Sequence, residues 1–102
     1  MRSKTTKIYS PNITTFGIGE AIKFLRNGHA VARRGWNGRN ICLKLQKPDK
    51  NSFMTQEYIY IDTTNLQSFN REAVKGRVPW VASQTDILAE DYIIVEVSGQ
   101  CE

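Results

Sequence analysis

The sequence contains little of the material from which metal centres and catalytic pairs are made. Its 102 residues include one histidine, His29, and two cysteines, Cys42 and Cys101. Neither their number nor their spacing is typical of a zinc site or a disulfide framework, and His29 has no cysteine or serine partner that the sequence indicates. We therefore expect no metal, no cofactor and no enzymatic activity. We also expect both cysteines to be reduced thiols.

Long apolar runs are missing as well. No stretch is long enough to cross a bilayer, and no apolar segment of the kind found in export signals follows the first residues. We expect a cytoplasmic protein that does not enter membranes. Hydrophobic residues make up 40% of the chain and charged residues 24%, which is ordinary for a folded domain. A chain of this length forms one domain with a modest core, so association with further copies would stabilise it.

Basic residues are absent from the last quarter of the chain. Residues 78–102 hold no lysine or arginine and five acidic residues, a net charge of −5, whereas residues 1–77 hold 14 basic and five acidic residues, a net charge of +9. This asymmetry indicates a polyanion-binding face, neutralisation across an oligomer interface, or simply a solvated surface with some pairing. The cations never form a block of five or six, so a disordered nucleic-acid-binding tail is not expected. The sequence pI of about 9.3 keeps a small basic nucleic-acid-binding protein as the alternative.

Periodicity predicts one helix and several strands. Ile18, Ala21, Ile22 and Leu25 form one apolar stripe of a helix over Ile18–Arg26, and Asn27-Gly28 is a typical left-handed stop. The β-rich runs are Ala30–Arg33, 41–46, 57–62 and 92–97. The first two are expected to form a hairpin around a turn at 36–38. The last is almost continuously apolar and is therefore expected at the centre of a sheet.

The remaining segments complete the predicted fold. Residues 63–77 are polar and are expected to form a long loop or a short additional hairpin. Ser83 is expected to cap a short helix that runs through Ala89. We predict an α+β fold: a small antiparallel sheet with one N-terminal helix and a short C-terminal helix, in one oligomeric domain. We expect an N-terminal arm over 1–15, the domain itself over 16–97 and a tail over 98–102.

An arginine-rich turn around Trp36 is the first cluster that indicates function. It reads Arg33-Arg34-Gly35-Trp36-Asn37-Gly38-Arg39. A tryptophan in such a setting stacks on a nucleobase, arginines pair with phosphates, and an asparagine recognises polar edges. The alternative is that Trp36 belongs to the core and that Asn37 only serves the turn.

The second cluster surrounds Trp80. It runs over residues 78–86 and ends where the short helix begins. Ser83 and Asp86, three residues apart, have the spacing of a helix N-cap pair. Equally, exposed backbone amides at the helix start could hold a phosphate or ribose hydroxyls.

Taken together, these clusters resemble the Thoeris anti-defence family of the second type. The similar stretches are Phe16-Gly17, Gly19-Glu20-Ala21-Ile22, 31–38, Tyr58-Ile59, Val78-Pro79-Trp80 and 83–92. The most specific pieces are the arginine-glycine-tryptophan-asparagine-glycine turn at 34–38 and the segment 79–92. This chain has Tyr92 where a tryptophan is common in the family. The N-terminal arm and the long polar segment 63–77 are further departures, and they bear on the choice of ligand more than on the fold.

The resemblance implies a phage protein that acts in the cytoplasm of the bacterial host. Members sequester cyclic ADP-ribose isomers made by a TIR-domain enzyme, without degrading them, and form homotetramers with ligand pockets at subunit interfaces. Some also bind cyclic dinucleotides at a separate site. From the two clusters and the resemblance we expect nine ligand-binding residues: Arg33, Arg34, Trp36, Asn37, Tyr58, Trp80, Ser83, Gln84 and Asp86.

Overall fold

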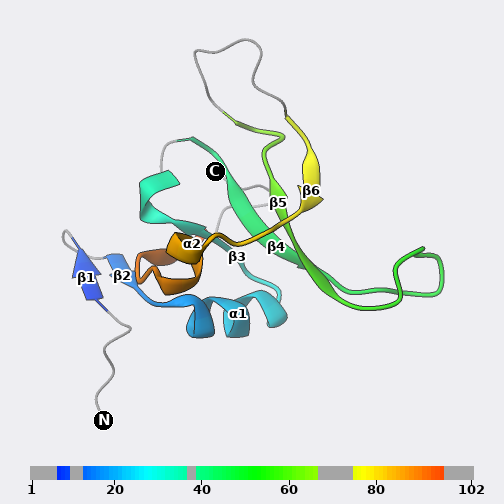
Figure 1. Ribbon diagram of the computed structural model, residues 1–102, viewed down its shortest axis with the longest axis horizontal. Coiled ribbons are helices and arrows are strands. Elements are labelled where there is room, and N and C mark those ends of the chain that lie inside the picture. Colours follow the sequence, from blue (N-terminus) through cyan, green and yellow to red (C-terminus); the bar gives the residue numbers. More distant parts are fainter. Residues whose placement is uncertain (1–6, 10–12, 37–38, 67–74, 96–102) are drawn as a thin grey trace.

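Five strands form one antiparallel sheet in the order β6-β5-β4-β3-β7. The computed structural model describes residues 7–9, 13–36, 39–66 and 75–95. The strands of the sheet are β3 (Ala30–Arg33), β4 (Cys42–Gln46), β5 (Tyr58–Asp62), β6 (Arg77–Pro79) and β7 (Tyr92–Val95). A separate two-stranded ribbon consists of β1 (Lys7–Tyr9) and β2 (Ile13–Thr15), and it lies at the opposite end of the molecule from the β4–β5 connection (Figure 1). With helices α1 (Ile18–Arg26) and α2 (Gln84–Leu88) added, the predicted α+β fold is confirmed.

Helix α1 (Ile18–Arg26) begins and ends where the sequence predicts. Its apolar stripe buries Ala21 and Leu25 against the sheet. The backbone N–H of Gly28, whose φ of 95° lies in the left-handed region, donates to the carbonyl of Leu25, and the N–H of His29 donates to that of Phe24. This pair of bonds is the Schellman arrangement, which satisfies carbonyls that the helix end would leave unpaired.

One face of the sheet holds the main core, and α1 covers it. The register places Val31 opposite both Leu43 and Ile94, so these side chains share a face. Val31 and Leu43 are almost fully buried together with residues of α1, and both tryptophans pack partly against this cluster. We call it the helix face.

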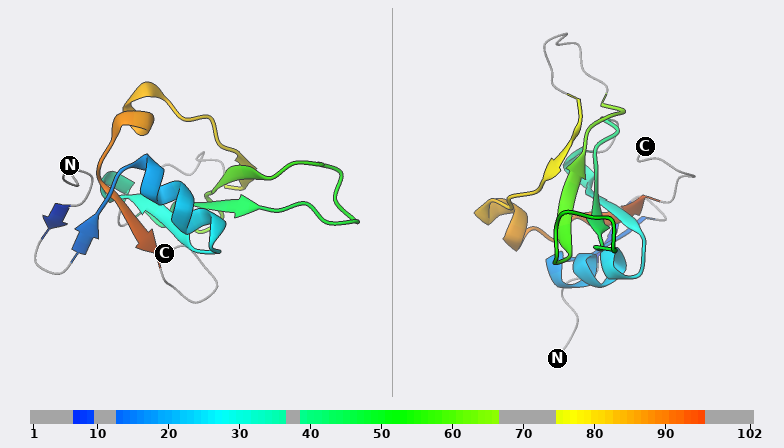
Figure 2. Two further views of the ribbon diagram at one scale, coloured as in Figure 1. Left: turned by 90° about the horizontal axis from the view of Figure 1, so that it is seen from below. Right: turned by 90° about the vertical axis from the view of Figure 1, so that its right-hand side faces the viewer.

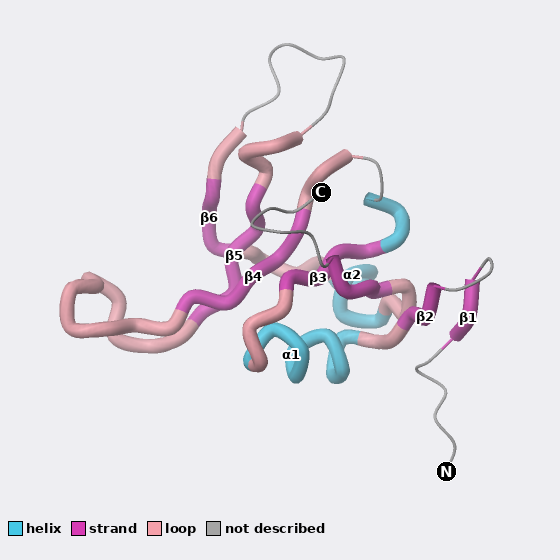
Figure 3. The backbone as a smooth tube through the Cα atoms, turned by 180° about the vertical axis from the view of Figure 1, so that it is seen from behind, coloured by secondary structure: helices cyan, strands magenta, loops and turns pink. Residues whose placement is uncertain are grey.

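The opposite face carries a much smaller cluster. There Ala32 and Cys42 are buried, and no residue of α1 or α2 packs against them. We call this the open face. In Figure 3, which shows the molecule from behind, β4, β5 and β6 lie toward the viewer. Cys42 is disulfide-bonded, so the expectation of a reduced thiol is wrong for it. The other cysteine, Cys101, lies outside the described residues.

Strand β7 lies at an edge of the sheet, which corrects the expectation that the apolar run at 92–97 is central. Its apolar residues are still partly buried, because Ile94 packs against the helix-face cluster, Val95 packs against the cluster on the opposite face, and Phe16 covers the start of the outer edge. Tyr92 is fully buried, and its backbone N–H and C=O exchange hydrogen bonds of 3.0 and 3.1 Å with Phe16. The chain that leads into α1 therefore occupies the edge where a neighbouring strand would pair.

Two connections extend beyond the sheet. The β4–β5 connection projects as a long hairpin beyond the C-terminal end of α1, away from the β1–β2 ribbon (Figures 1 and 2). Strands β5 and β6 pair through Asp62 and Arg77, so the two ends of the polar segment 63–77 lie side by side. This agrees with the prediction of an additional hairpin. Residues 67–74 of the segment lie outside the described part. Strand β6 and the β1–β2 ribbon are not among the strands that periodicity predicts, because each spans three residues. Within the described ranges no helix is long and apolar enough to span a bilayer.

Candidate functional site

Arg33 holds the C-terminal part of the chain against the end of β3. Its Nη1 donates to Asp86 Oδ1 and its Nε donates to Asp91 Oδ1, both at 2.9 Å. The Arg33 side chain is only 23% exposed, so both ion pairs are partly screened from water. Burial alone would lower the pKa of Arg33, but the hydrogen bonds and charges of the two aspartates raise it above its ordinary value. We call these three residues the arginine clamp.

Helix α2 (Gln84–Leu88) starts inside this clamp. The backbone N–H and the hydroxyl of Ser83 both donate to Asp86 Oδ2 at 2.9 Å, and the N–H of Asp86 donates back to Ser83 Oγ at 3.1 Å. This is a complete capping box, so the N-cap interpretation of Ser83 and Asp86 is confirmed. The amide of Asp86 already has a partner, which leaves it unavailable to a phosphate.

Asp86 is held in its charged form. Partial burial by itself would raise the pKa of this carboxyl, but the two hydrogen bonds from Ser83 and the guanidinium of Arg33 lower it below its ordinary value. The carboxylate therefore accepts hydrogen bonds on both oxygens at neutral pH.

Two further residues of the site are absent from the sequence prediction. Tyr92 donates its phenolic hydrogen to the backbone carbonyl of Asp86, and burial, with the nearby charge of Asp86 adding to it, raises its pKa to about 12. Asp91 completes the arginine clamp, and its carbonyl accepts a hydrogen bond of 2.8 Å from the Arg34 N–H. The antiparallel pairing of Arg33 with Tyr92 brings both residues here. A sequence signal existed in the three carboxyl groups, Asp86, Glu90 and Asp91, that lie within the six residues before β7.

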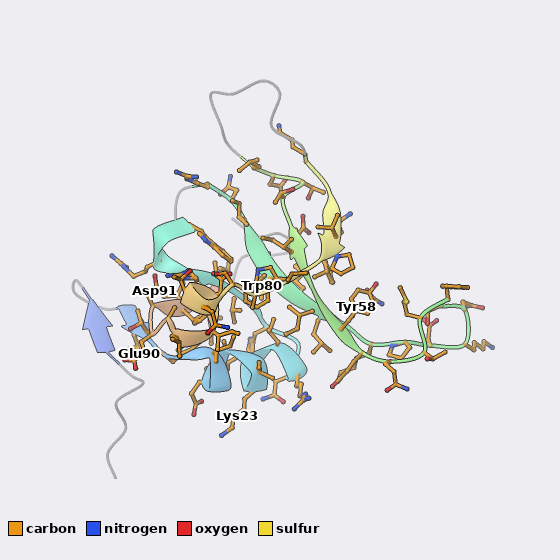
Figure 4. The ribbon with its side chains drawn as sticks, in the orientation of Figure 1. Lys23, Tyr58, Trp80, Glu90 and Asp91 are labelled. Atoms are coloured by element: carbon orange, nitrogen blue, oxygen red, sulfur yellow. The ribbon has the colours of Figure 1, made fainter. Side chains whose placement is uncertain are left out.

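Both tryptophans lie partly in the core. Trp36 ends a 3-10 turn over Arg34–Trp36 and packs against the clusters of both sheet faces, so the core interpretation is correct for part of its ring. Trp80 packs against the helix-face cluster, and its backbone N–H donates to Ile59 at 2.9 Å. Figure 4 shows Trp80 between Asp91 and Tyr58, beside the chain that enters α2. Each indole is half-buried and keeps part of its surface toward solvent.

The structure gathers six of the nine predicted residues around the helix face. Arg33, Ser83 and Asp86 form the clamp and cap, while Trp36 and Trp80 pack on the core beneath them. The sixth, Gln84, is exposed as the first residue of α2. Arg34 follows directly after β3 and is half-buried. Asn37 lies outside the described residues.

Tyr58 belongs to the open face. The register pairs it with Gln46, and Tyr60 with Lys44, two positions whose side chains point away from the helix face. It therefore lies across the sheet from Arg33. A pocket of about 380 Å³ opens there, and its lining is mostly polar and aromatic: Lys44, Gln46, Tyr58, Tyr60, Arg77, Val78 and Pro79.

An ion pair between the exposed Arg77 and the buried Asp62 supports this pocket. Arg77 Nε donates to Asp62 Oδ2 at 3.0 Å, and the hydroxyl and N–H of Thr64 donate to the other oxygen at 2.6 and 2.9 Å. Although burial would raise the pKa of Asp62, the bonds from Thr64 and Arg77 lower it. Burial first, and then the charge of Asp62, raises the pKa of Tyr60. The pocket thus presents two tyrosine rings, a lysine side chain and one side of a guanidinium, a set that suits a planar anionic ligand.

In chemical terms, both faces are suited to holding a ligand. In the described ranges, no group of three or more histidine, cysteine, aspartate or glutamate side chains is placed to hold a metal ion. The carboxylates of the helix face are occupied by Arg33 and Ser83. The groups that remain at its rim are indole rings and an exposed amide, which stack and donate hydrogen bonds.

Comparison with known proteins gives consistent results. The sequence profile of the Thoeris anti-defense 2-like domain matches residues 16–95. The chain is also similar to the protein named Thoeris anti-defense 2 from Bacillus phage SP01. The two are 40% identical over 86 residues, which cover 80% of this chain and 97% of the relative. The matched range begins at Phe16, whose backbone pairs with Tyr92, and ends with the last residue of β7.

Proposed function

The chain belongs to the Thoeris anti-defense 2-like family and is a phage anti-defence protein, and we propose that it acts by sequestering a cyclic ADP-ribose isomer in the host cytoplasm without degrading it. The family carries the name of an anti-defence protein and not of an enzyme. In this proposal, a TIR-domain enzyme of the host makes the signal, and the protein lowers its free concentration.

The observation that carries the proposal is the arginine clamp beside the half-buried tryptophans. Arg33 ties the start of α2 to the sheet before any ligand arrives. A surface that is already ordered loses little conformational entropy when it binds, so more of the contact energy remains as affinity. Trp80 and the capped start of α2 belong to the same tied segment.

We assign ligand contacts to the residues at the rim of this surface. An indole of Trp36 or Trp80 stacks on the adenine, a contact worth about 1–3 kcal/mol. The exposed amide of Gln84 meets ribose hydroxyls, and Arg34 meets the pyrophosphate. Arg33 and Asp86 act mainly by holding this rim in place, because their side chains already form a hydrogen-bonded ion pair with each other.

We further propose that the protein assembles as a homotetramer and that each pocket is completed at a subunit interface. The basic first part of the chain and the acidic last part support this, since their opposite net charges attract across an interface. The open-face pocket around Tyr58 is proposed as the separate site for a cyclic dinucleotide, since it offers two aromatic rings together with Lys44 and Arg77.

Isothermal titration with a panel of cyclic nucleotides tests the assignment of the ligand. We expect a cyclic ADP-ribose isomer to bind, and Gln84→Ala to weaken binding about three- to tenfold, the effect of one hydrogen bond. Asn65→Ala is the matched control, because Asn65 is an exposed amide in the β5–β6 connection. Equal affinity of the two variants would contradict the assignment of Gln84, and no binding of any cyclic ADP-ribose isomer would contradict the function.

A second candidate function is binding of single-stranded nucleic acid at the open face. Tyr58 and Tyr60 lie on one strand with ring centroids 6.5 Å apart, and they are flanked by Lys44 and Arg77, as in stacking platforms for single strands. Salt separates the two functions, because binding to a phosphate backbone weakens steeply between low and moderate salt, and binding of a small ligand in a pocket does not.

A further inference from the structure

The β4–β5 hairpin is an ordered arm that carries an uncovered aromatic ring. We call residues 47–57 the arm. At its tip the N–H of Ser52 donates to the carbonyl of Asp49, and the N–H groups of Asp49 and Asn51 donate to the side chains of Ser52 and Asp49. On this hydrogen-bonded turn Phe53 is 94% exposed, and Met54 beside it is 48% exposed. An exposed phenylalanine on an ordered loop does not stabilise the isolated chain, because its ring remains in solvent. Such a ring is suited to insertion into a partner.

The base of the arm is braced against the C-terminal end of α1. Arg26 Nε lies 3.1 Å from Glu57 Oε2, and Lys47 Nζ donates to the carbonyl of Arg26 at 3.2 Å. These contacts join the base of the arm to the C-terminal end of α1, and the arm projects beyond that end, away from the β1–β2 ribbon (Figures 1 and 2).

A partly apolar groove lies at the other end of α1. It has a volume of about 390 Å³ and runs between the first turn of α1 and the end of α2. Its lining residues are Gly17, Ile18, Gly19, Glu20, Lys23, Ile87, Leu88, Ala89 and Glu90. Leu88 is 74% exposed and Ile87 is 40% exposed, and each presents apolar surface at the groove. In Figure 4, Lys23 and Glu90 mark its two sides.

The lengths of the arm and of α1 match. The nine residues of α1 span roughly 13 Å at 1.5 Å per residue. On its longer side the arm can reach roughly 16 Å from base to tip, because residues 53–57 lie between the turn and the base. If two copies meet with their arm bases together and related by a twofold axis, each arm runs along the partner's α1 and its tip arrives at the partner's groove. A twofold axis makes the two contacts identical.

The charges at the tip and the groove are complementary as well. Lys50 is exposed on the turn that presents Phe53, where the carboxylate of Asp49 accepts a hydrogen bond from the N–H of Asn51. Glu20 and Glu90 line the groove, with Lys23 as the one lining cation. An approaching tip thus brings a cation to a rim with an excess of carboxylates.

We propose that the arm of one copy docks along α1 of a second copy and inserts Phe53 into the groove beside Leu88. The occupant of the groove is a second copy of this chain. This inference specifies one interface of the proposed homotetramer and assigns the arm to it. It places no residue of the arm in contact with the cyclic nucleotide.

Photo-crosslinking tests the contact directly. The full chain is made with photoreactive benzoylphenylalanine in place of Phe53, in equal amounts of ¹⁴N- and ¹⁵N-labelled protein, and crosslinked peptides are identified by mass spectrometry. We expect mixed light–heavy crosslinks from position 53 to residues 17–23 or 84–90. Crosslinks confined to one chain, or directed to another region of the second copy, would overturn the proposal.

Sedimentation of exposed-residue variants gives an independent test. Phe53→Ser and Leu88→Ser should each raise the dissociation constant of the assembly at least tenfold. The double variant should be little worse than either single variant, because the two side chains lose the same contact. Thr55→Ala, an exposed change on the same arm, is the control and should have no effect. Unaltered assembly of Phe53→Ser would overturn the proposal.

The two proposals can fail separately. If the wild-type chain binds a cyclic ADP-ribose isomer while position 53 labels another surface, this interface is wrong and sequestration stands. If position 53 labels the groove while no cyclic nucleotide binds, the interface stands and the proposed function is wrong.

Discussion

Arg33 and Asp86 are 53 positions apart in the chain, and their side chains meet in an ion pair with 2.9 Å between Nη1 and Oδ1. The same guanidinium binds Asp91 on the other side of α2. A five-residue helix has little stability of its own, so this clamp and the capping box of Ser83 fix its position. The surface to which we assign ligand binding therefore depends on residues that mostly bind one another.

Removal of the Arg33 guanidinium should destabilise the protein. Arg33→Gln leaves Asp86 and Asp91 partly buried without their cation, and we expect a loss of about 2 kcal/mol in the free energy of unfolding. Urea denaturation measures it. Arg39→Gln, an exposed arginine in the same sequence cluster, should change stability by less than about 0.5 kcal/mol. Equal midpoints for the two variants would show that the clamp contributes nothing.

Acid should weaken the fold through Asp86 and Asp62. The folded state lowers the pKa of both carboxyls, so between the folded and the ordinary pKa the unfolded chain binds more protons. The stability that these groups contribute is present above the ordinary value of 3.8 and is lost as the pH falls through the folded pKa. Denaturation midpoints should fall from about pH 5 downward. Asp86→Asn should flatten this dependence, and an unchanged slope would contradict our assignment.

Local sequence patterns predict α1, β3 and the cap of α2, because interactions between residues close together in the sequence determine these elements. The stripe of Ala21 and Leu25, the stop at Gly28 and the Ser83–Asp86 pair all act within one turn of helix. The edge position of β7 could not be predicted in this way. It depends on Phe16, which lies more than seventy positions earlier and occupies the strand's outer edge. A long apolar run indicates only that the residues of a strand are shielded from solvent. It does not indicate whether another strand or a loop shields them.

Trp36 should contribute to both folding and binding. Its ring packs against both core clusters, so Trp36→Ala should cost about 2 kcal/mol, less than for a fully buried ring. We expect this variant to melt cooperatively and to bind no cyclic ADP-ribose isomer. Trp36→Phe should restore most of the stability and part of the affinity. An alanine variant that loses cooperative melting, or one that melts lower and still binds, would show that the residue serves the core alone.

The composition of the site could be predicted only in part. The family resemblance groups Tyr58 with the two tryptophans, but the β4–β5 register places it on the opposite face of the sheet. A shift of one residue in register exchanges the two faces, and no local signal in β5 specifies it, because its four partly buried residues are all apolar or aromatic. Asp91 and Tyr92 come to the site through long-range pairing with Arg33, which composition does not reveal.

Substitution of Tyr58 should therefore separate the two proposed sites. Tyr58→Ala removes one ring of the open-face pocket and leaves the arginine clamp intact. Titration should show unchanged binding of a cyclic ADP-ribose isomer and at least tenfold weaker binding of a cyclic dinucleotide, which corresponds to about 1.4 kcal/mol. Leu66→Ala, a partly buried change outside this pocket, serves as the control for nonspecific loss of stability. Loss of both ligands in Tyr58→Ala alone would mean that they share one site.

Recovery of the ligand tests sequestration most directly. Inhibition of a signal that acts below micromolar concentration requires a dissociation constant near nanomolar, about −12 kcal/mol, which stacking and charge-assisted hydrogen bonds in an ordered pocket can supply. The protein is mixed with a cyclic ADP-ribose isomer until free signal disappears, the complex is denatured by heat, and the supernatant is analysed by mass and by activation of the effector. We predict full recovery of unchanged, active signal at one ligand per site. A product of new mass, or consumption of more than one ligand per site, would show that the protein is an enzyme and contradict the proposal.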